Sequence, residues 1–313
     1  MEDPKATRAG YGDGLAELGE ARRDVVALDA DLAKSTKSIK FKEKFPARFF
    51  EMGISEQDMV ATAAGFALAG KIPYASSFAC FLTGRAYDQI RTSVCYSNVN
   101  VKLAGSHAGL MTGEDGATHQ ALEDISLMRG LPNMKVIVPA DYFEAKIATK
   151  KAADIPGPVY LRLARAKTPI YFNDNYKFTL GKGVVMKSGS DVAIIACGAP
   201  LQYALEAAER LKKDKIEAAV VNMPSIKPLD SKLVSKMATQ AGAIVTVEDH
   251  SIYGGLGSAV AEVMAEEGLA PVERVGMKDV FGESGKGSEL YKKYGLDSEG
   301  IINAVKIVIG KRK

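Results

Sequence analysis

The chain has 313 residues, of which 47% are hydrophobic and 25% are charged, and its formal net charge is +3. This balance is typical of a globular protein and excludes a disordered or collagen-like chain. The longest apolar runs fall far short of the roughly 20 residues that a membrane helix requires. The N-terminal segment contains acids and glycines but no apolar stretch of a secretory signal. We therefore expect a cytoplasmic protein with neither a membrane nor nucleic acid as its partner.

The three cysteines, Cys80, Cys95 and Cys197, lie far apart and form no C-x-x-C pair. Such spacing indicates neither a disulfide framework nor a zinc site. We expect three reduced thiols and no metal site in this chain.

Short β-rich runs alternate with helical periodicity, which predicts an α/β fold of two consecutive domains, each a mostly parallel sheet covered by helices. The elements expected in the first domain are strands at 25–28, 101–104, 135–138 and 159–161 and helices at 6–20, 55–69, 84–96, 118–129 and 141–153. Those expected in the second are strands at 191–196, 217–222 and 243–247 and helices at 200–213, 230–240 and 256–267. A stretch rich in Asn, Asp and Gly predicts a linker at 173–190 between domains at 1–172 and 191–313.

Two of the three histidines, His107 and His119, lie in a glycine-rich segment that also contains Glu114 and Asp115. Glycine is required where the backbone approaches a ligand or adopts a positive φ, so a polar ligand site is one interpretation. The alternative is a long exposed loop without a function, in which Thr118 caps the next helix. The spacing of the histidines fits no compact zinc motif.

Glu56 begins the helix expected at 55–69, where the helix dipole favours an acid whatever the function. Phe78 and Phe81 follow shortly after, and core packing is the usual role of such a pair. From these residues alone, a structural and a catalytic interpretation both stay open.

Two glycine motifs are interpreted as coincidences. Gly12-Asp13-Gly14 looks like the start of the metal-diphosphate motif of thiamine enzymes, but it lies inside a predicted helix and lacks the downstream asparagine. Tyr253-Gly254-Gly255-Leu256-Gly257 fits a nucleotide-binding loop only in part. Nucleotide binding is therefore not expected.

Three strings are too specific for a general α/β protein. They are Gly53-Ile54-Ser55-Glu56-Gln57, Ser77-Phe78-x-x-Phe81 and Gly113-Glu114-Asp115-Gly116-x-Thr118-His119-Gln120. Together they resemble the C-terminal half of transketolase. The likeness extends over nearly the whole chain, through Lys5–Arg8, Pro139–Asp141, Leu161–Arg165 and Val247–His250. The resemblance implies a pyrimidine-binding domain followed by the family's C-terminal domain.

The resemblance implies thiamine diphosphate as the cofactor. In that chemistry the C2 proton is removed by the cofactor's own 4'-imino group, once a carboxylate shares a proton with N1'. By resemblance, Glu56 is that carboxylate, Phe81 stacks on the aminopyrimidine, and Phe78 and Arg85 complete the pocket. We expect an N-terminal partner subunit to supply the diphosphate site and the ligands of Mg²⁺ or Ca²⁺, in an α2β2 heterotetramer.

The resemblance also assigns a sugar site. His119 lies near the C1 and C2 oxygens of the donor, Asp115 reads a donor hydroxyl, and His107 helps to bind sugar or phosphate. The two histidines and Glu56 are therefore the catalytic candidates.

Arginines are the candidates for the phosphate, since their donors match phosphate oxygens. By resemblance these are Arg8 and Arg165, with Ser35 as a weaker helper and Arg162 as an alternative to Arg165.

The implied function is the transfer of a two-carbon ketol unit from a ketose phosphate to an aldose phosphate in the non-oxidative pentose phosphate pathway, as the C-terminal subunit of a split transketolase. One alternative is a related thiamine enzyme, either a deoxyxylulose-phosphate synthase or a 2-oxo acid dehydrogenase β subunit. Another is a catalytically silent scaffold. The loop Gly113–Gln120 favours transketolase, and the presence of Glu56, Phe81, Asp115 and His119 argues against a silent subunit.

Overall fold

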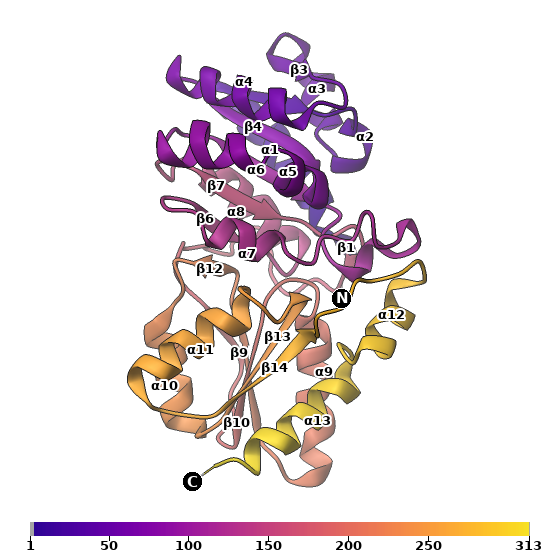
Figure 1. Cartoon of the computed structure of the whole chain (residues 1–313), viewed down its shortest axis with the longest axis vertical. Helices are drawn as coiled ribbons and strands as arrows, with labels where there is room; N and C mark the ends of the chain where they lie inside the picture. The colour runs from indigo at the N-terminus through magenta and orange to yellow at the C-terminus, as the bar shows by residue number, and fades with distance from the viewer. Residues whose placement is uncertain (1–2, 313) are drawn as a thin grey trace.

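The computed structural model describes residues 3–312, which form two α/β domains joined end to end (Figure 1). Within these residues, a seven-stranded sheet forms the first domain and a five-stranded sheet the second. A small antiparallel ribbon of β1 (Lys5–Ala6) and β8 (Lys167–Thr168) joins the beginning and the end of the first domain. No described helix has the length and apolar character of a membrane span. The expected α/β architecture is confirmed.

The first sheet is parallel except at one edge. Its strands, in spatial order, are β12 (Ser225–Lys227), β6 (Lys135–Ile137), β7 (Val159–Arg162), β5 (Lys102–Ser106), β4 (Ile72–Phe78), β2 (Val25–Asp29) and β3 (Phe49–Glu51). The antiparallel edge strand β12 follows β11 of the second sheet in the chain, so the second half of the sequence completes the first sheet. The domains are therefore connected by more than a linker.

Helices cover both faces of this sheet, and β2 and β4 are buried along their whole length, as parallel strands normally are. The helical segments are α1 (Thr7–Ala21), α2 (Ala33–Thr36), α3 (Ile39–Lys44), η1 (Pro46–Arg48), α4 (Glu56–Leu68), α5 (Ala79–Arg85), α6 (Tyr87–Gln89), the π-helix η2 (Ile90–Tyr96), η3 (Leu110–Asp115), α7 (Asp124–Arg129) and α8 (Tyr142–Ala152).

The glycines of α1 serve helix packing. A Cβ on Gly10 or Gly14 would come within 2.1 or 2.6 Å of a carbonyl oxygen of α8, so only glycine permits the close approach. Between them Asp13 accepts hydrogen bonds from Lys40 and from the hydroxyl of Tyr142. These contacts give Gly12-Asp13-Gly14 a packing role.

The second sheet is parallel except for β9, which pairs antiparallel with β11. Its strands, in spatial order, are β14 (Val272–Met277), β13 (Ile244–Ser251), β10 (Val192–Ala196), β11 (Ala218–Asn222) and β9 (Val184–Lys187). Its helical segments are α9 (Leu201–Leu211), η4 (Lys212–Asp214), α10 (Ser231–Ala241), α11 (Leu256–Glu267), α12 (Gly287–Tyr294) and α13 (Ser298–Ile309).

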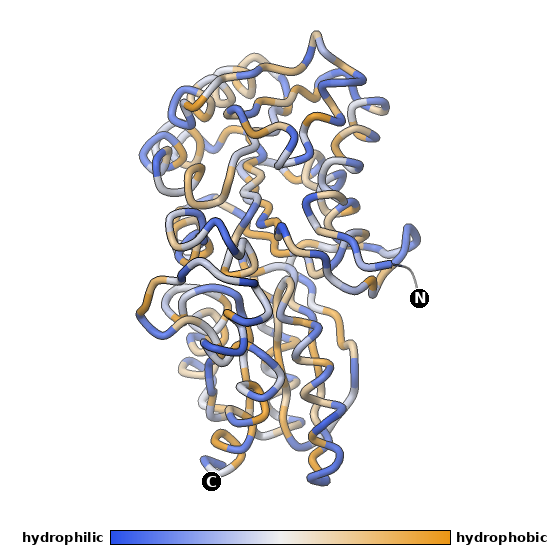
Figure 2. Tube along the Cα trace, turned by 90° about the vertical axis from the view of Figure 1, so that its right-hand side faces the viewer, coloured by the Kyte–Doolittle hydropathy of each residue, from blue (hydrophilic) through white to orange (hydrophobic). Residues whose placement is uncertain are grey.

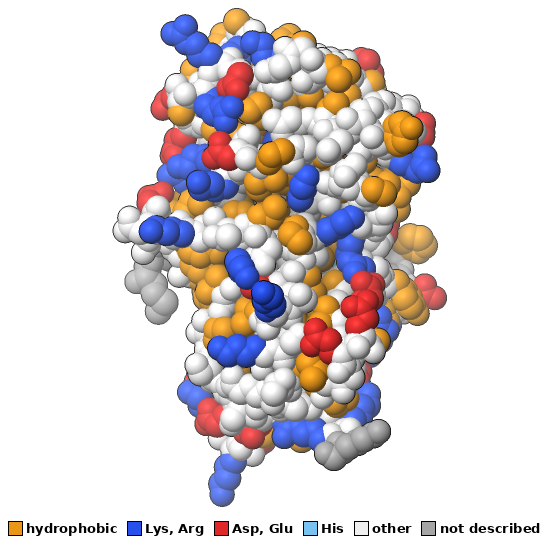
Figure 3. All heavy atoms as spheres, turned by 90° about the vertical axis from the view of Figure 1, so that its left-hand side faces the viewer, with side chains coloured by type: hydrophobic (Ala, Val, Ile, Leu, Met, Phe, Trp, Pro, Cys, Tyr) orange, Lys and Arg blue, Asp and Glu red, His pale blue; other side chains and the backbone are white. Residues whose placement is uncertain are grey.

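A single hydrophobic cluster runs from one domain into the other. It contains Met134 and Val136 of the first domain as well as Cys197, Met223 and Ile226, which come later in the chain. Figure 2 shows apolar and polar segments alternating along the trace of both domains. On the face shown in Figure 3, lysines and arginines are scattered among acids, with apolar side chains exposed between them.

Several local elements differ from the expectation. The strand β4 was not expected, because Pro73, Ser76 and Ser77 give it no run of β-branched residues. The helix expected at 84–96 is instead α5, α6 and the π-helical η2. The strand β9 lies inside the expected linker, and the domain limits stay a prediction.

The helix expected at 118–129 begins only at Asp124, so Thr118 is not its cap. Tertiary pairing prevents an earlier start, since Ala121 bridges to Ala108 and the carbonyl of Leu122 accepts a hydrogen bond from the amide of Ser251. The segment before Asp124 thus stays irregular.

Candidate active site

Glu56 is the first residue of α4 and is 3% exposed. Arg85 donates to both of its carboxylate oxygens, at 3.1 and 3.3 Å, and the hydroxyl of Ser77 lies 3.4 Å from Oε1. An acid that serves only the helix dipole needs no burial, as the exposed Asp58 in the same turn illustrates. Helix stabilisation therefore does not account for the burial of Glu56 or for its pairing with Arg85.

An aromatic surface lies beside this carboxylate. The guanidinium carbon of Arg85 is 4.2 Å from the centre of the Phe81 ring, and Phe81 stacks on Phe78 at 5.8 Å. Phe78 ends β4 and Phe81 lies in α5, so the strand-to-helix junction presents both rings at one place. A flat group that donates hydrogen bonds already rests on Phe81 within reach of Glu56. The same geometry suits an aminopyrimidine ring.

His107 joins the aromatic surface to the polar part of the site. Its ring stacks on Phe78 with centroids 3.9 Å apart, and its Nε2 accepts a hydrogen bond from Arg8 at 3.2 Å. Burial, followed by the charge of Arg8, lowers the pKa of His107 to about 3, so the ring is neutral at neutral pH. Because arginine only donates, Nδ1 carries the ring proton and donates it to the Ser106 hydroxyl at 2.9 Å.

Arg8 lies in the first turn of α1 and is held in place from two sides. Its Nη1 also donates to the carbonyl oxygen of Ser35 at 2.8 Å, and its Nε is buried without a hydrogen-bond partner among the described residues. Burial and the nearby charge of Arg165 lower the pKa of Arg8. Two cations kept close together, one with an unused donor, provide a place for an anion. Ser35 contributes its carbonyl to this arrangement.

The glycine-rich segment lies at the rim of the same site. His119 packs edge-on against Phe81, with centroids 5.1 Å apart, and its Nδ1 contacts the Thr118 hydroxyl at 2.9 Å. Asp115 lies 3.6 Å from Arg165, whose Nη1 also donates to the carbonyl of Thr112. The loop therefore brings a carboxylate, an imidazole and an arginine together.

Arg162 has a different environment. Its Nε and Nη2 bind the buried carboxylate of Asp124 at 2.8 and 3.1 Å, and Nη2 also donates to the carbonyls of Ala121 and Asp249. These interactions hold Arg162 in the domain junction. Of this pair, Arg165 is the arginine that contacts the glycine-rich segment, at Thr112 and Asp115.

The structure thus brings the predicted site residues to one edge of the first sheet. Glu56, Phe78, Phe81, Arg85, His107, His119, Arg8, Ser35, Asp115 and Arg165 are linked through direct contacts or shared neighbours. Most follow the carboxyl ends of parallel strands, where α/β sheets bind ligands. A cavity of about 390 Å³ beside η2, lined in part by Tyr96 and Asn133, contains none of them. Within residues 3–312, no cluster of three or more His, Cys, Asp or Glu is arranged to hold a metal.

Sequence reasoning missed three contributors. The hydroxyl of Ser77 contacts Glu56, and Thr112 donates from its hydroxyl to the carbonyl of His107 at 2.6 Å. Burial, followed by the charge of Arg8, lowers the pKa of Lys37, which adds a third cation near the anion site. Only Ser77 had a sequence signal, since it directly precedes Phe78.

Comparison with known proteins identifies the family. Residues 3–170 match the pyrimidine-binding domain of transketolase, and residues 181–301 match the transketolase C-terminal domain. A putative transketolase C-terminal section from Methanocaldococcus jannaschii is 48% identical, over 96% of this chain and 95% of that protein. A subunit of 6-deoxy-6-sulfo-D-fructose transketolase from Clostridium sp. (strain MSTE9) is 40% identical, over 94% and 91%.

A solved structure described as a split gene transketolase in an inactive β4 tetramer superposes with a TM-score of 0.92 at 50% identity. The superposition covers 98% of this chain and 99% of that one. The expected order of domains is thereby confirmed. The chain belongs to the transketolase family and corresponds to its C-terminal half.

Proposed function

We propose that this chain is the C-terminal subunit of a split transketolase, which transfers a two-carbon ketol unit from a ketose phosphate to an aldose phosphate with thiamine diphosphate. The observation that carries the proposal is the buried Glu56 carboxylate, which binds Arg85 while the Arg85 guanidinium lies over the ring of Phe81. A silent scaffold would not need a buried acid placed beside an aromatic platform.

Thiamine diphosphate, when bound, supplies the nucleophilic carbon and holds the transferred unit. Glu56 would hold a proton shared with N1' of the aminopyrimidine, and the nearly dry surroundings of its carboxylate favour such sharing. Phe81 would orient the ring by stacking, which leaves the ring's proton sites free. His119, at the edge of Phe81, is placed to hold a proton at a donor oxygen.

The anionic end of the donor would bind between Arg8 and Arg165. Arg8 has an unused buried Nε donor, and His107 fixes its guanidinium. Asp115, at Arg165, is placed to accept a hydrogen bond from a sugar hydroxyl. The Clostridium relative is named for a sulfonated ketose, which carries a different anion at its end. We propose the phosphate donor, and with it a place in the non-oxidative pentose phosphate pathway.

The diphosphate and metal site belongs to a partner in this proposal. The described residues contain no metal-ligating cluster, and Gly12-Asp13-Gly14 is used for helix packing. An N-terminal transketolase subunit would supply the ligands of Mg²⁺ or Ca²⁺, and two copies of each chain would form an α2β2 heterotetramer. We also propose a cytoplasmic location, where the three free cysteines stay reduced.

The test is a coupled assay of glyceraldehyde 3-phosphate release from xylulose 5-phosphate and ribose 5-phosphate. It compares this chain alone, the N-terminal subunit alone, and both mixed with thiamine diphosphate and Mg²⁺. We expect activity only in the mixture. Activity of this chain alone would overturn the dependence on a partner.

A second donor separates transketolase from its alternatives. If a cofactor-bound mixture turns over 6-deoxy-6-sulfofructose but not xylulose 5-phosphate, the proposal of a phosphorylated donor is wrong, whereas the proposal of ketol transfer stands. If it turns over pyruvate in place of ketoses, the chain is a subunit of a related thiamine enzyme.

A further inference from the structure

A carboxylate of the second domain, that of Asp249 near the end of β13, binds the backbone of the glycine-rich segment that follows β5. Asp249 is 3% exposed, and its Oδ1 and Oδ2 accept hydrogen bonds from the backbone amides of Leu110 and Met111 at 2.8 and 3.3 Å. These amides begin η3, in the glycine-rich segment of the first domain. A Cβ on the preceding Gly109 would come within 2.1 Å of Asp249 Oδ2, so the glycine permits this contact.

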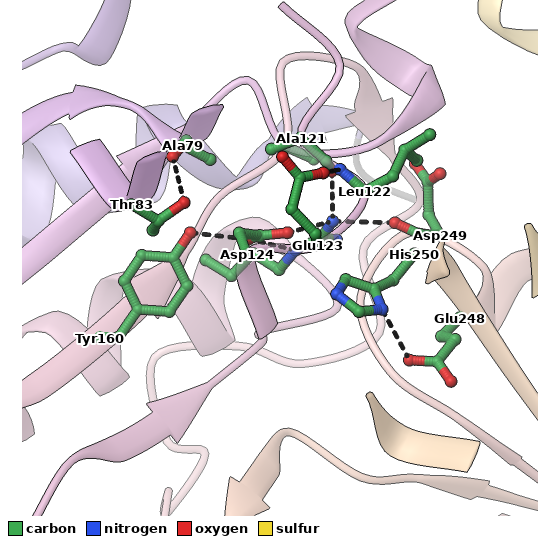
Figure 4. A network of polar contacts seen from close by, with 12 residues as sticks. Ala79, Thr83, Ala121, Leu122, Glu123, Asp124, Tyr160, Glu248, Asp249 and His250 are labelled. Carbon is green, nitrogen blue, oxygen red and sulfur yellow. Dashed lines mark hydrogen bonds and ion pairs between the residues drawn. The ribbon is translucent and has the colours of Figure 1, made fainter. Parts of the chain in front are cut away.

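The backbone of Asp249 is fixed by the first domain. Its backbone carbonyl accepts a hydrogen bond from Arg162 Nη2 at 2.8 Å, and Arg162 is fixed by the buried Asp124. Tyr160 donates to the same Asp124 carboxylate at 2.7 Å. Figure 4 shows Asp124, Tyr160 and Asp249 converging at the domain junction. The carboxylate that binds the loop is therefore anchored to β7 of the first sheet.

The glycine-rich segment is held by turn hydrogen bonds and a single β-bridge, with little regular secondary structure. Its only helical segment, η3, is six residues long and contains a non-helical Gly113, and His107 adopts a φ of 56°. The second domain supplies further support, since the amide of Ser251 donates to the carbonyl of Leu122. Leu110 and Leu122 also pack in a small hydrophobic cluster with side chains of the second domain, namely Met277, Leu290, Tyr291 and Leu296.

A short chain of contacts leads from Asp249 to the anion site. Thr112 directly follows the two amides that Asp249 binds, its hydroxyl donates to the carbonyl of His107, and its carbonyl accepts from Arg165. His107 in turn accepts from Arg8. Thr112 thus contacts Arg165 directly and is connected to Arg8 through His107.

We propose that Asp249 is a positioning residue of the second domain, which fixes Leu110–Thr112 and thereby places His107, Arg165 and Arg8 for the anionic end of the donor. This inference rests on the proposed function and assigns the second domain a task in substrate binding. The aminopyrimidine side of the site, built from β4, α4 and α5, meets this chain of contacts where His107 stacks on Phe78, whereas Glu56 is held by Arg85 and Ser77.

The sequence offers a matched control in the adjacent residue. Glu248 is 1% exposed and accepts from the amides of Leu256 and Gly257, both at 2.8 Å, at the beginning of α11 in its own domain. Burial raises the pKa of Glu248 and of Asp249. Asp249→Asn and Glu248→Gln therefore disturb equally buried carboxylates, only one of which binds the loop.

The experiment measures both variants in the assembled enzyme with its N-terminal subunit. Asp249→Asn should raise KM for xylulose 5-phosphate by about tenfold, because an amide nitrogen cannot accept from Met111. The change in kcat should be smaller, and the thiamine diphosphate concentration for half-maximal activity should stay unchanged. Glu248→Gln should leave KM unchanged. The proposal would be overturned if the two variants changed KM equally. It would also be overturned if Asp249→Asn weakened thiamine diphosphate binding as much as donor binding.

Hydrogen exchange on the free subunit supplies a readout that needs no activity. Asp249→Asn should accelerate exchange at Leu110–Thr112 and leave β4 protected, whereas Glu248→Gln should not. Unchanged exchange at Leu110–Thr112 would overturn the positioning role even if the enzyme proves to use another donor. If wild-type complex transfers no ketol unit, the proposed function fails, and this measurement still decides about Asp249.

A second variant covers the case in which Asp249→Asn does not fold. Thr112→Val removes only the hydroxyl that donates to His107, in a fully buried side chain of similar shape. It should raise KM for the phosphorylated ketose without changing cofactor affinity. An unchanged KM would break the proposed chain of contacts at Thr112.

Discussion

Arg85 binds both carboxylate oxygens of Glu56, yet the two side chains differ sharply in exposure. The arginine side chain is 50% exposed and the glutamate 3%. The partner of the buried acid is thus half exposed, and its guanidinium lies on the ring of Phe81. Arg85 therefore connects the acid and the aromatic ring through direct contacts with both.

Glu56→Gln should abolish ketol transfer while leaving the fold intact. We expect a loss in kcat of about 10²-fold or more, since an amide cannot share a proton as a carboxylate does. Asp58→Asn is the control, because Asp58 is an exposed acid in the same helical turn. Equal losses of kcat in the two variants, measured in the assembled complex, would show that Glu56 only interacts with the helix dipole.

Phe81→Leu should weaken cofactor binding more than it slows turnover. Loss of stacking costs about 0.5–1.5 kcal/mol beyond the change in buried area, which raises the thiamine diphosphate requirement by up to about tenfold. Phe50→Leu is the control, because Phe50 packs on Phe66 at 4.7 Å and not on the site residues. Cofactor titration of the assembled enzyme measures both, and an unchanged requirement in Phe81→Leu would remove the ring from the cofactor site.

Substitutions of Arg165 and Arg162 should have different effects, the first on donor binding and the second on stability. Arg165→Gln should raise KM for the phosphorylated donor by about tenfold with little change in stability, since Arg165 is partly exposed at the loop. Arg162→Met should destabilise the fold by about 3–5 kcal/mol, because it leaves the buried Asp124 charge uncompensated. Denaturant unfolding and donor kinetics separate the two effects, and a stable Arg162→Met subunit with only a raised KM would reverse this assignment.

His107 should make the subunit less stable in acid. Its pKa is 6.5 in the unfolded chain and about 3 in the fold, because burial and the charge of Arg8 disfavour the imidazolium. The unfolded chain therefore binds more protons between these values, so the stability is present above pH 6.5 and is lost as the pH falls towards 3. At pH 5 the loss is about 2 kcal/mol.

His107→Asn should flatten this dependence. Denaturant unfolding of the wild type and the variant at pH 5 and pH 7.5, at one protein concentration, measures the difference. Parallel losses in both proteins would mean that His107 is not the group responsible.

Much of the fold was predictable because hydrophobic periodicity is local. The strands predicted at 25–28 and 159–161 and the helix predicted at 141–153 depend only on patterns among neighbouring residues. The structure contains β2, β7 and α8 at these positions. The strand β4 was not predicted from periodicity, because Ser76 and Ser77 are polar residues. In the fold, Ser76 forms a hydrogen bond with the buried Tyr11 hydroxyl, and the Ser77 hydroxyl contacts Glu56. Their burial depends on partners distant in sequence.

The sequence by itself determined the residue types of the site, since the strings around Glu56, Phe81 and His119 carry the likeness to transketolase. Only the tertiary structure decided which arginine lies partly exposed at the candidate site, because Arg162 and Arg165 differ in their burial and in the groups that surround them. It also decided what Asp249 touches, since hydrogen bonds between residues more than a hundred positions apart leave no local pattern. Periodicity reports on neighbours along the chain, whereas charge pairing and loop position depend on neighbours in space.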